Sequence, residues 1–461
     1  MVRAPFFART ALGMALALGV AAGGLSSVAV AKDKKPEAPK IQPTKAFVPF
    51  YQAAAQGLDK ASKRQDVIDA RAAVTAAEGA YRSAQGKKAR DEAKAAYDGA
   101  IAKLIALLAP EYDLVEKALT AATAPEDKFY AGQLGLNLGN MAYDKRMQRR
   151  GILTVVESGK LPAADAAKYQ YFAGALSYDL KEYPAARTSL QAAIAGGYAG
   201  DEVTALLVDA YINDNMAVEG LKVLEAASTG RSTPAPEAWL QKGVVVGYKG
   251  KFAEQANRFA YMLVDGYPTQ SNWALSIATV RDMSKFANQE LIDLMRLMDR
   301  TNSFSEGRDY FDYIQSADAR RLPGETLKII DKGIAAGKLE ANDPAVKDQR
   351  EIAAGRIAPD KASLAGLERD ARAPNATAAT AMAAGDAFLS YDNPAKAVEM
   401  YTIALAKPGV DSPRVLTRLG IAQTDLGLYA DAQATFAKVT GIRQPIAQLW
   451  MAYAKSKAAG K

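Results

Sequence analysis

A spacing of sixteen residues between a glycine and a large side chain recurs along this chain and limits its fold more than any other feature. The pairs are Gly174 and Leu190, Gly243 and Phe259, Gly385 and Tyr401, and Gly420 and Phe436. The marker positions themselves recur: Gly174, Val208, Gly243 and Ile277 follow one another after 34, 35 and 34 residues. This period predicts stacked helix pairs. A small residue lets the two helices cross closely, with Ala432 expected opposite Gly420, and each pair covers the apolar face of the next.

The residue types at these intervals resemble those of the tetratricopeptide repeat (TPR) family. The unit Pro413 to Gln444 matches best, with Leu416, Leu419, Gly420, Tyr429, Ala432 and Phe436, and the unit Ala378 to Ser412 carries Gly385, Phe388, Ala397, Tyr401 and Ala404. Units near Ala167, Asp201 and Pro236 match in part. The unit near Gln270 keeps Trp273 and Phe286 but has Asp293 where a large apolar residue is expected, which predicts a rotated or shifted second helix.

The resemblance covers residues 126–444 and implies an all-α, right-handed α-solenoid of TPR-like helix pairs. From the length between Ile277 and Gly385, two further pairs are expected near Glu306 and Asn342. Residues 445–461 are expected to form a capping helix. An N-terminal helical hairpin region, residues 47–125, precedes the array, with two helices between Gln52 and Leu108 that turn at Gln85–Lys87. A long self-associating coiled coil is the alternative for this region.

The first 31 residues are typical of an export signal. Arg3 and Arg9 precede an apolar stretch, and Ala29, Val30 and Ala31 offer small residues before a cut at Lys32. An uncleaved membrane anchor is the alternative. Residues 32–46 combine prolines with lysines and predict a disordered linker. The mature protein is therefore expected in the periplasm or secreted from a bacterial cell, without a transmembrane segment.

The chain has no cysteine and no histidine. Thiolate nucleophiles, Ser-His-Asp relays and the usual zinc and haem sites need these residues, so we expect a protein that is not an enzyme and has no cofactor or metal. With Arg3 and Arg9 removed from 58 basic residues, 51 acidic ones leave a net charge of +5. We expect no nucleic-acid partner. The basic run Lys145–Arg150 is interpreted as a solvated helix face, with a binding patch as the alternative. Asn213–Asn215 is interpreted as a turn rather than a cation site.

The resemblance implies that the first helices of the pairs line a groove for a protein or peptide partner. Six residues four or five positions after the marker sites are expected to face it: Tyr178, Asp179, Asn213, Tyr248, Arg281 and Asp282. Ordinary solvated helix positions are the alternative for these residues. Three functions are compatible with the sequence: an exported scaffold for envelope proteins, which we favour, a module that binds cell-wall or surface glycan, and a glycan-processing enzyme. The partner's identity and the oligomeric state do not follow from the sequence.

Overall fold

The computed structural model describes residues 41–460, which form helices and contain no strand. Pro43 begins a single compact unit that continues through the described chain. The expected signal peptide, residues 1–31, and residues 32–40 of the expected linker lie outside the described residues. Within the described part, none of the helices combines the length and apolar character needed to cross a membrane.

Four helices precede the repeats: α1 (Val48–Lys63), α2 (Gln65–Ser83), α3 (Lys87–Leu107) and α4 (Ala109–Ala121). The expected hairpin consists of α2 and α3, which turn at Gly86 with a φ of +81°. The region from Gln52 to Leu108 therefore holds three helices rather than two, because the extended backbone of Arg64 separates α1 from α2. The Arg64 guanidinium fixes this break by donating to Glu111 Oε1 (3.2 Å) and to the Leu107 carbonyl (3.4 Å).

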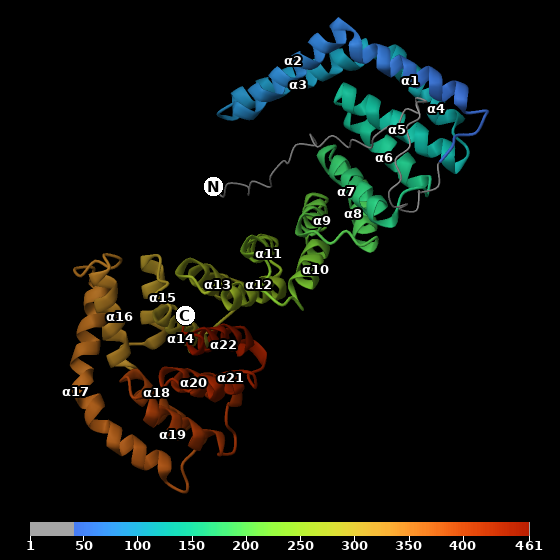
Figure 1. Cartoon of the computed structure of the whole chain (residues 1–461). Helices are drawn as coiled ribbons and strands as arrows, with labels where there is room; N and C mark the ends of the chain where they lie inside the picture. Colours follow the sequence, from blue (N-terminus) through green and yellow to red (C-terminus); the bar gives the residue numbers. More distant parts are fainter. Residues whose placement is uncertain (1–40, 461) are drawn as a thin grey trace, which may run out of the picture. The chain divides into compact units, whose positions relative to one another are not determined.

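The helix pairs then follow in the expected order (Figure 1). Their bounds are α5 (Pro125–Ala142) with α6 (Lys145–Glu157), α7 (Ala163–Asp179) with α8 (Tyr183–Ala195), α9 (Asp201–Asn213) with α10 (Ala217–Ser228), α11 (Glu237–Gly250) with α12 (Ala253–Gly266), α13 (Gln270–Met283) with α14 (Asn288–Arg300), α15 (Gly307–Ala317) with α16 (Pro323–Ala335), α18 (Ala378–Ser390) with α19 (Pro394–Leu405), and α20 (Ser412–Asp425) with α21 (Tyr429–Phe436). The predicted all-α solenoid of TPR-like pairs is confirmed.

The sixteen-residue interval has a direct structural cause. A Cβ atom on Gly420 would lie 2.5 Å from Phe436 Cε1, and one on Gly385 would lie 2.6 Å from Tyr401 Cε1. The corresponding contact of Gly174 is with Leu190, at 2.6 Å. Each marker glycine therefore lies directly beneath the large side chain of its partner helix. The three atoms nearest to a Cβ on Gly420 all belong to the ring of Phe436, so this ring, and not the expected Ala432, is its nearest neighbour.

One expected pair is absent. The segment near Asn342, expected to form two helices, is a single helix, α17 (Pro344–Arg372), of 29 residues. It packs between α16 and α18 (Figure 1). Arg350 Nε donates to Asp331 of α16 (2.8 Å), and Asp360 accepts from the Tyr391 hydroxyl beyond α18 (2.7 Å). The length of this segment is compatible with one long helix as well as with a helix pair, because either can connect α16 to α18.

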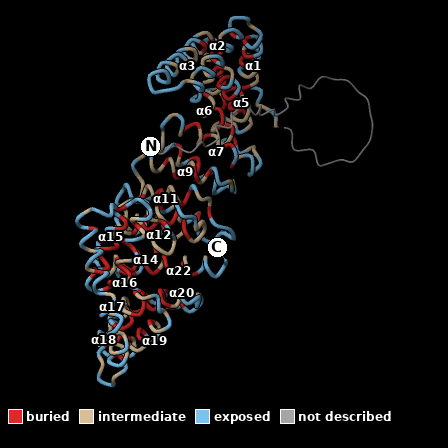
Figure 2. The backbone as a smooth tube through the Cα atoms, turned by 90° about the vertical axis from the view of Figure 1, so that its left-hand side faces the viewer, coloured by how far each residue is buried: buried red, intermediate tan, exposed pale blue. Residues whose placement is uncertain are grey.

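The final helix, α22 (Gln444–Ala458), does more than cover the last pair. It packs on α21 and also on α12, more than 170 positions earlier in the sequence, and Figures 1 and 2 both place it beside α12 and α14. Trp450 is fully buried, and its indole Nε1 donates to the Asp293 carbonyl of α14 (2.8 Å). Helices α12 to α22 thus form a closed circuit of contacts, which we call the closed array. Among the extensive helix contacts of the described residues, none returns in this way within α5 to α11, which we call the open array.

Asp293 explains how the closed array holds its ends together. Its carboxylate is fully buried and accepts from Arg296 Nη1 (3.0 Å), Arg418 Nε (3.2 Å) and Arg443 Nη1 (2.6 Å). Further buried contacts extend this group through Glu325, which binds Arg296, and Asp386, which binds Arg418. We call these six residues the ionic cluster. The carboxylate thus serves as the counter-charge for arginines from distant repeats, which accounts for an acid where a large apolar residue was expected. The predicted rotation or shift of this helix agrees with the packing, because α14 packs less extensively on α13 than the second helix of any other pair packs on its first.

Electrostatics in the ionic cluster favour the charged forms. Burial alone would raise the pKa of Asp293, but the nearby charges of Arg418, Arg443 and Arg296 outweigh it and hold the pKa below its usual range. Glu325 behaves in the same way: burial raises its pKa, but Arg296, Tyr313 and Arg300 together lower it by more. Both carboxylates therefore remain ionised inside the protein at neutral pH.

Candidate functional site

The six residues expected to face a partner lie at the ends of alternate helices. Tyr178 and Asp179 end α7, Asn213 ends α9, Tyr248 belongs to the last turn of α11, and Arg281 and Asp282 lie near the end of α13. They thus come from four successive first helices of the pairs. We call this set the polar row.

Polar contacts join each first helix of the row to the next. Asn213 Nδ2 donates to the Tyr178 hydroxyl (3.0 Å), and Tyr248 donates its hydroxyl hydrogen to Asp282 (3.2 Å). Between these two contacts, the Lys242 ammonium binds Asp209 (2.7 Å). The row is therefore a chain of contacts between neighbouring repeats as well as a surface.

Members of the row differ in how accessible they are. Tyr248 is 44% exposed, and the Asp179 side chain, which pairs with Lys145 (2.6 Å), is 47% exposed. The Arg281 side chain is only 10% exposed and donates to Asp309 (2.8 Å) and Asp312 (3.2 Å) of α15. Arg281 thus serves mainly to join α13 to α15, whereas Tyr248 and Asp179 offer polar atoms to solvent.

Burial changes the acidity of one tyrosine in the row. Partial burial, reinforced by the negative charge of Asp209, raises the pKa of Tyr178 to about 12. Its hydroxyl therefore stays protonated at neutral pH and is able to donate as well as accept. This chemistry suits hydrogen bonding rather than proton transfer near pH 7.

Sequence reasoning missed the partners that complete the row. Lys242 and Asp209 are separated by 33 residues, and Arg281 and Asp309 by 28. A search for opposite charges about one repeat apart would have found the first pair. It would have missed the second, because its separation is shorter than one repeat.

The basic run at the start of α6 is largely solvated, since the side chains of Lys145, Arg146 and Arg150 are 44%, 73% and 48% exposed. Lys145 binds Asp179, Arg146 and Arg149 bind Glu182, and Arg150 binds Glu116. The interpretation of the run as a solvated helix face is therefore confirmed, and these ion pairs occupy the charges that a binding patch would need. Asn213–Asn215 does form the predicted turn, with Asn215 at a φ of +60°. The three tryptophans are core residues, each at most 4% exposed.

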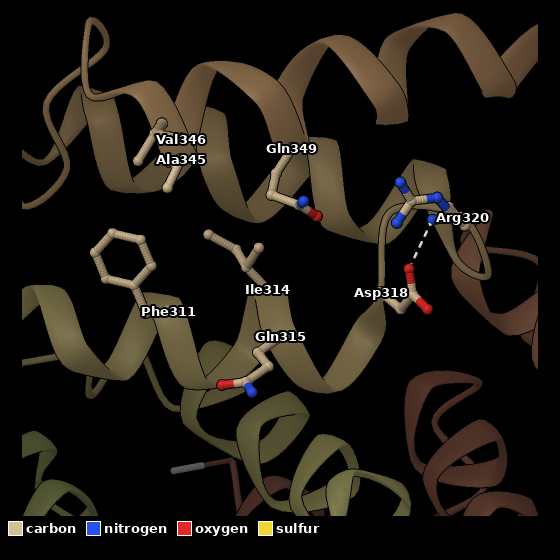
Figure 3. A pocket seen from close by; sticks show the side chains of 8 residues that line it. All are labelled: Phe311, Ile314, Gln315, Asp318, Arg320, Ala345, Val346 and Gln349. Atoms are coloured by element: carbon tan, nitrogen blue, oxygen red, sulfur yellow. Dashed lines mark hydrogen bonds between the residues drawn. The ribbon is translucent and has the colours of Figure 1, made fainter.

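A second candidate surface is a cleft of about 330 Å³ between α15 and α17 (Figure 3). Its apolar part contains Phe311, Ile314 and Val346, and Phe311 is 42% exposed. At the other end, Asp318 accepts a hydrogen bond from the backbone of Arg320 (3.0 Å). The eight lining residues offer one carboxylate and no second acid, so they do not form an acid and base pair.

Comparisons with known proteins found no matching family model and no matching curated protein. Among solved structures, the chain is similar to Naa15/Naa10 bound to HypK-THB, with a TM-score of 0.33, 12% identity, and coverage of 90% of this chain and 73% of that one. It is similar to the human IFIT1 dimer with PPP-AAAA, with a TM-score of 0.21, 13% identity, and coverage of 81% and 86%. The APC/C hetero-tetramer Cut9-Hcn1 has a TM-score of 0.19, 14% identity, and coverage of 77% and 83%.

Proposed function

We propose that this protein is a non-catalytic scaffold of the bacterial cell envelope that binds an extended segment of a partner protein along the polar row. The observation that carries the proposal is the presentation of similar polar groups on four successive helices, α7, α9, α11 and α13. An extended peptide contacts successive repeats of such an array in turn.

The chemistry of the row supports binding. Tyrosine supplies a large contact area at a low cost in conformational entropy, and carboxylates and amides supply hydrogen bonds that fix a peptide backbone. The absence of histidine and cysteine from the sequence weighs against the common nucleophile and base arrangements.

The test compares two aromatic residues of similar exposure. Tyr248→Ala combined with Asp282→Ala should abolish cross-linking to the partner protein in envelope extracts, and the thermal melting curve should stay nearly unchanged. Phe311→Ala is the matched control, because Phe311 is 42% exposed but lies in the cleft between α15 and α17. It should leave partner binding intact.

The reverse result, with binding lost in Phe311→Ala and kept in the row variant, would move the partner site to the cleft. Sedimentation of the wild-type protein with purified cell wall, without any protein partner, would instead favour glycan binding. The proposed location has its own test, since N-terminal sequencing of envelope material should return Lys32. Recovery of Met1 or Val2 there would contradict export by cleavage.

A further inference from the structure

Arg414 is the one arginine around the ionic cluster that lacks a close counter-charge. It lies in the first turn of α20, and its side chain is 15% exposed. Its Nε atom is buried and has no hydrogen-bond partner among the described residues. In the same part of the chain, Asp386 is the one carboxylate within 4 Å of its guanidinium, with Oδ2 3.9 Å from Nη2.

Asp386 is already engaged by other groups. Its Oδ2 accepts from Arg418 Nη1 (2.5 Å), and its Oδ1 accepts from the Tyr401 hydroxyl (2.8 Å). The neighbouring Asp293 is likewise occupied by three arginines. Burial, and then the positive charge of Arg418, lower the pKa of Arg414, whereas Arg418 itself has a raised pKa.

Stability alone does not account for an arginine in this position. A largely buried cation is costly when its nearest carboxylate lies 3.9 Å away and is engaged by other groups, and an apolar side chain of similar length would pack there without that cost. The backbone N–H of Arg414 is capped by Asp411, so the end of α20 needs nothing more from the side chain. Positions that break the rules of stability in this way are often kept for binding.

We propose that Arg414 is a binding site for an oxyanion, a carboxylate or a phosphate group, at the edge of the ionic cluster. The planar guanidinium presents Nε and a neighbouring N–H in the fork geometry that matches two oxygens of such a group. Because the side chain is only 15% exposed, a ligand would have to be a small anion or an anionic group at the end of a flexible chain. This site belongs to the closed array and is separate from the polar row.

The test measures thermal unfolding of the full chain in chloride, acetate and phosphate at pH 7 and equal ionic strength. In chloride, Arg414→Gln should melt at or above the wild-type temperature, because a largely buried charge with only a distant, shared counter-charge has been removed. Phosphate or acetate should raise the wild-type melting temperature by about 2 °C more than that of the variant. The comparison between variants is essential, because phosphate stabilises proteins in general by exclusion from their surface.

Arg308→Gln is the matched control, since the Arg308 side chain is 62% exposed and pairs with Asp282 and Asp312. This variant should keep the full response to anions. A response to phosphate but not to acetate assigns the site to phosphate groups, and the opposite assigns it to carboxylates. If Arg414→Gln lowers the melting temperature in chloride and responds to both anions as the wild type does, Arg414 is structural and the proposal is wrong.

Discussion

The open array and the closed array use the same helix pair but hold their repeats together differently. In the open array, buried residues fall into separate clusters, one around Ile152 and Tyr169 and another around Leu190 and Leu207. A third cluster begins in the open array, at Ala205 of α9, and continues without a break through the whole closed array to Ala454 of α22. The charges differ as well: Lys145 and Asp179 are both more than 40% exposed, whereas Asp293 and Arg418 are at most 1% exposed.

This difference shows that repeats of similar sequence need not unfold independently of one another. In a linear array each unit contacts its neighbours, and damage stays local. Once α22 contacts α12, every helix between them belongs to one circuit, and loss of any link removes support from both ends. We therefore expect the closed array to unfold as a unit and the open array to open in parts.

The largest effect is expected from Asp293→Ala. The change leaves three buried arginines without their shared counter-charge, which should cost about 3 to 5 kcal/mol of unfolding free energy. Hydrogen exchange should show joint loss of protection in α12, α14, α20 and α22. Asp179→Ala, which removes an exposed partner of Lys145, is the control and should cost about 0 to 1 kcal/mol. Equal effects of the two variants would contradict the distinction between the arrays.

Lowering the pH should distinguish the stability of the closed array from that of the open array without any mutation. The pKa values of Asp293 and Glu325 are lower in the folded protein than in the unfolded chain, so the unfolded chain binds these protons first. Their stabilisation is present above the ordinary carboxyl pKa of about 4 and is lost as the pH falls through the lowered values. Hydrogen exchange below pH 4 should therefore show the closed array losing protection as one unit. Gradual loss, helix by helix from α22 backward, would argue against the circuit.

A smaller effect is expected from matched glycine substitutions. Gly174→Leu and Gly420→Leu each force a side chain against a large partner, Leu190 or Phe436, and each should cost about 1 to 3 kcal/mol. The loss of unfolding free energy should be similar for the two variants, but the helices that it affects should differ. Exchange should increase around α7 and α8 for Gly174→Leu, and as far as α12 and α14 for Gly420→Leu. If the increase in exchange for Gly420→Leu stays within α20 and α21, the contact between α22 and α12 couples the repeats only weakly.

The sequence predicted the helix pairs well because their signal is local. The glycine and its large partner lie sixteen residues apart within one pair, so the contact recurs wherever the spacing recurs. The sequence did not predict the single helix α17, because the pair expected there rested on segment length and not on a motif. It did not predict the role of Asp293 either, because the repeat pattern has a large apolar residue at that position. For the candidate site, the pattern placed six residues on successive helices but did not reveal that Arg281 is mostly covered.

The sequence by itself therefore determined the fold class, the period and the register of the helices, because each depends on side chains within one or two repeats. Tertiary structure decided the closure and with it the division into two arrays. Asp293 meets Arg418 and Arg443 across 125 and 150 residues, a separation set by the accumulated rotation of many helix pairs. Small differences in packing at each pair add up over that distance, so no local spacing encodes where the chain returns to contact itself.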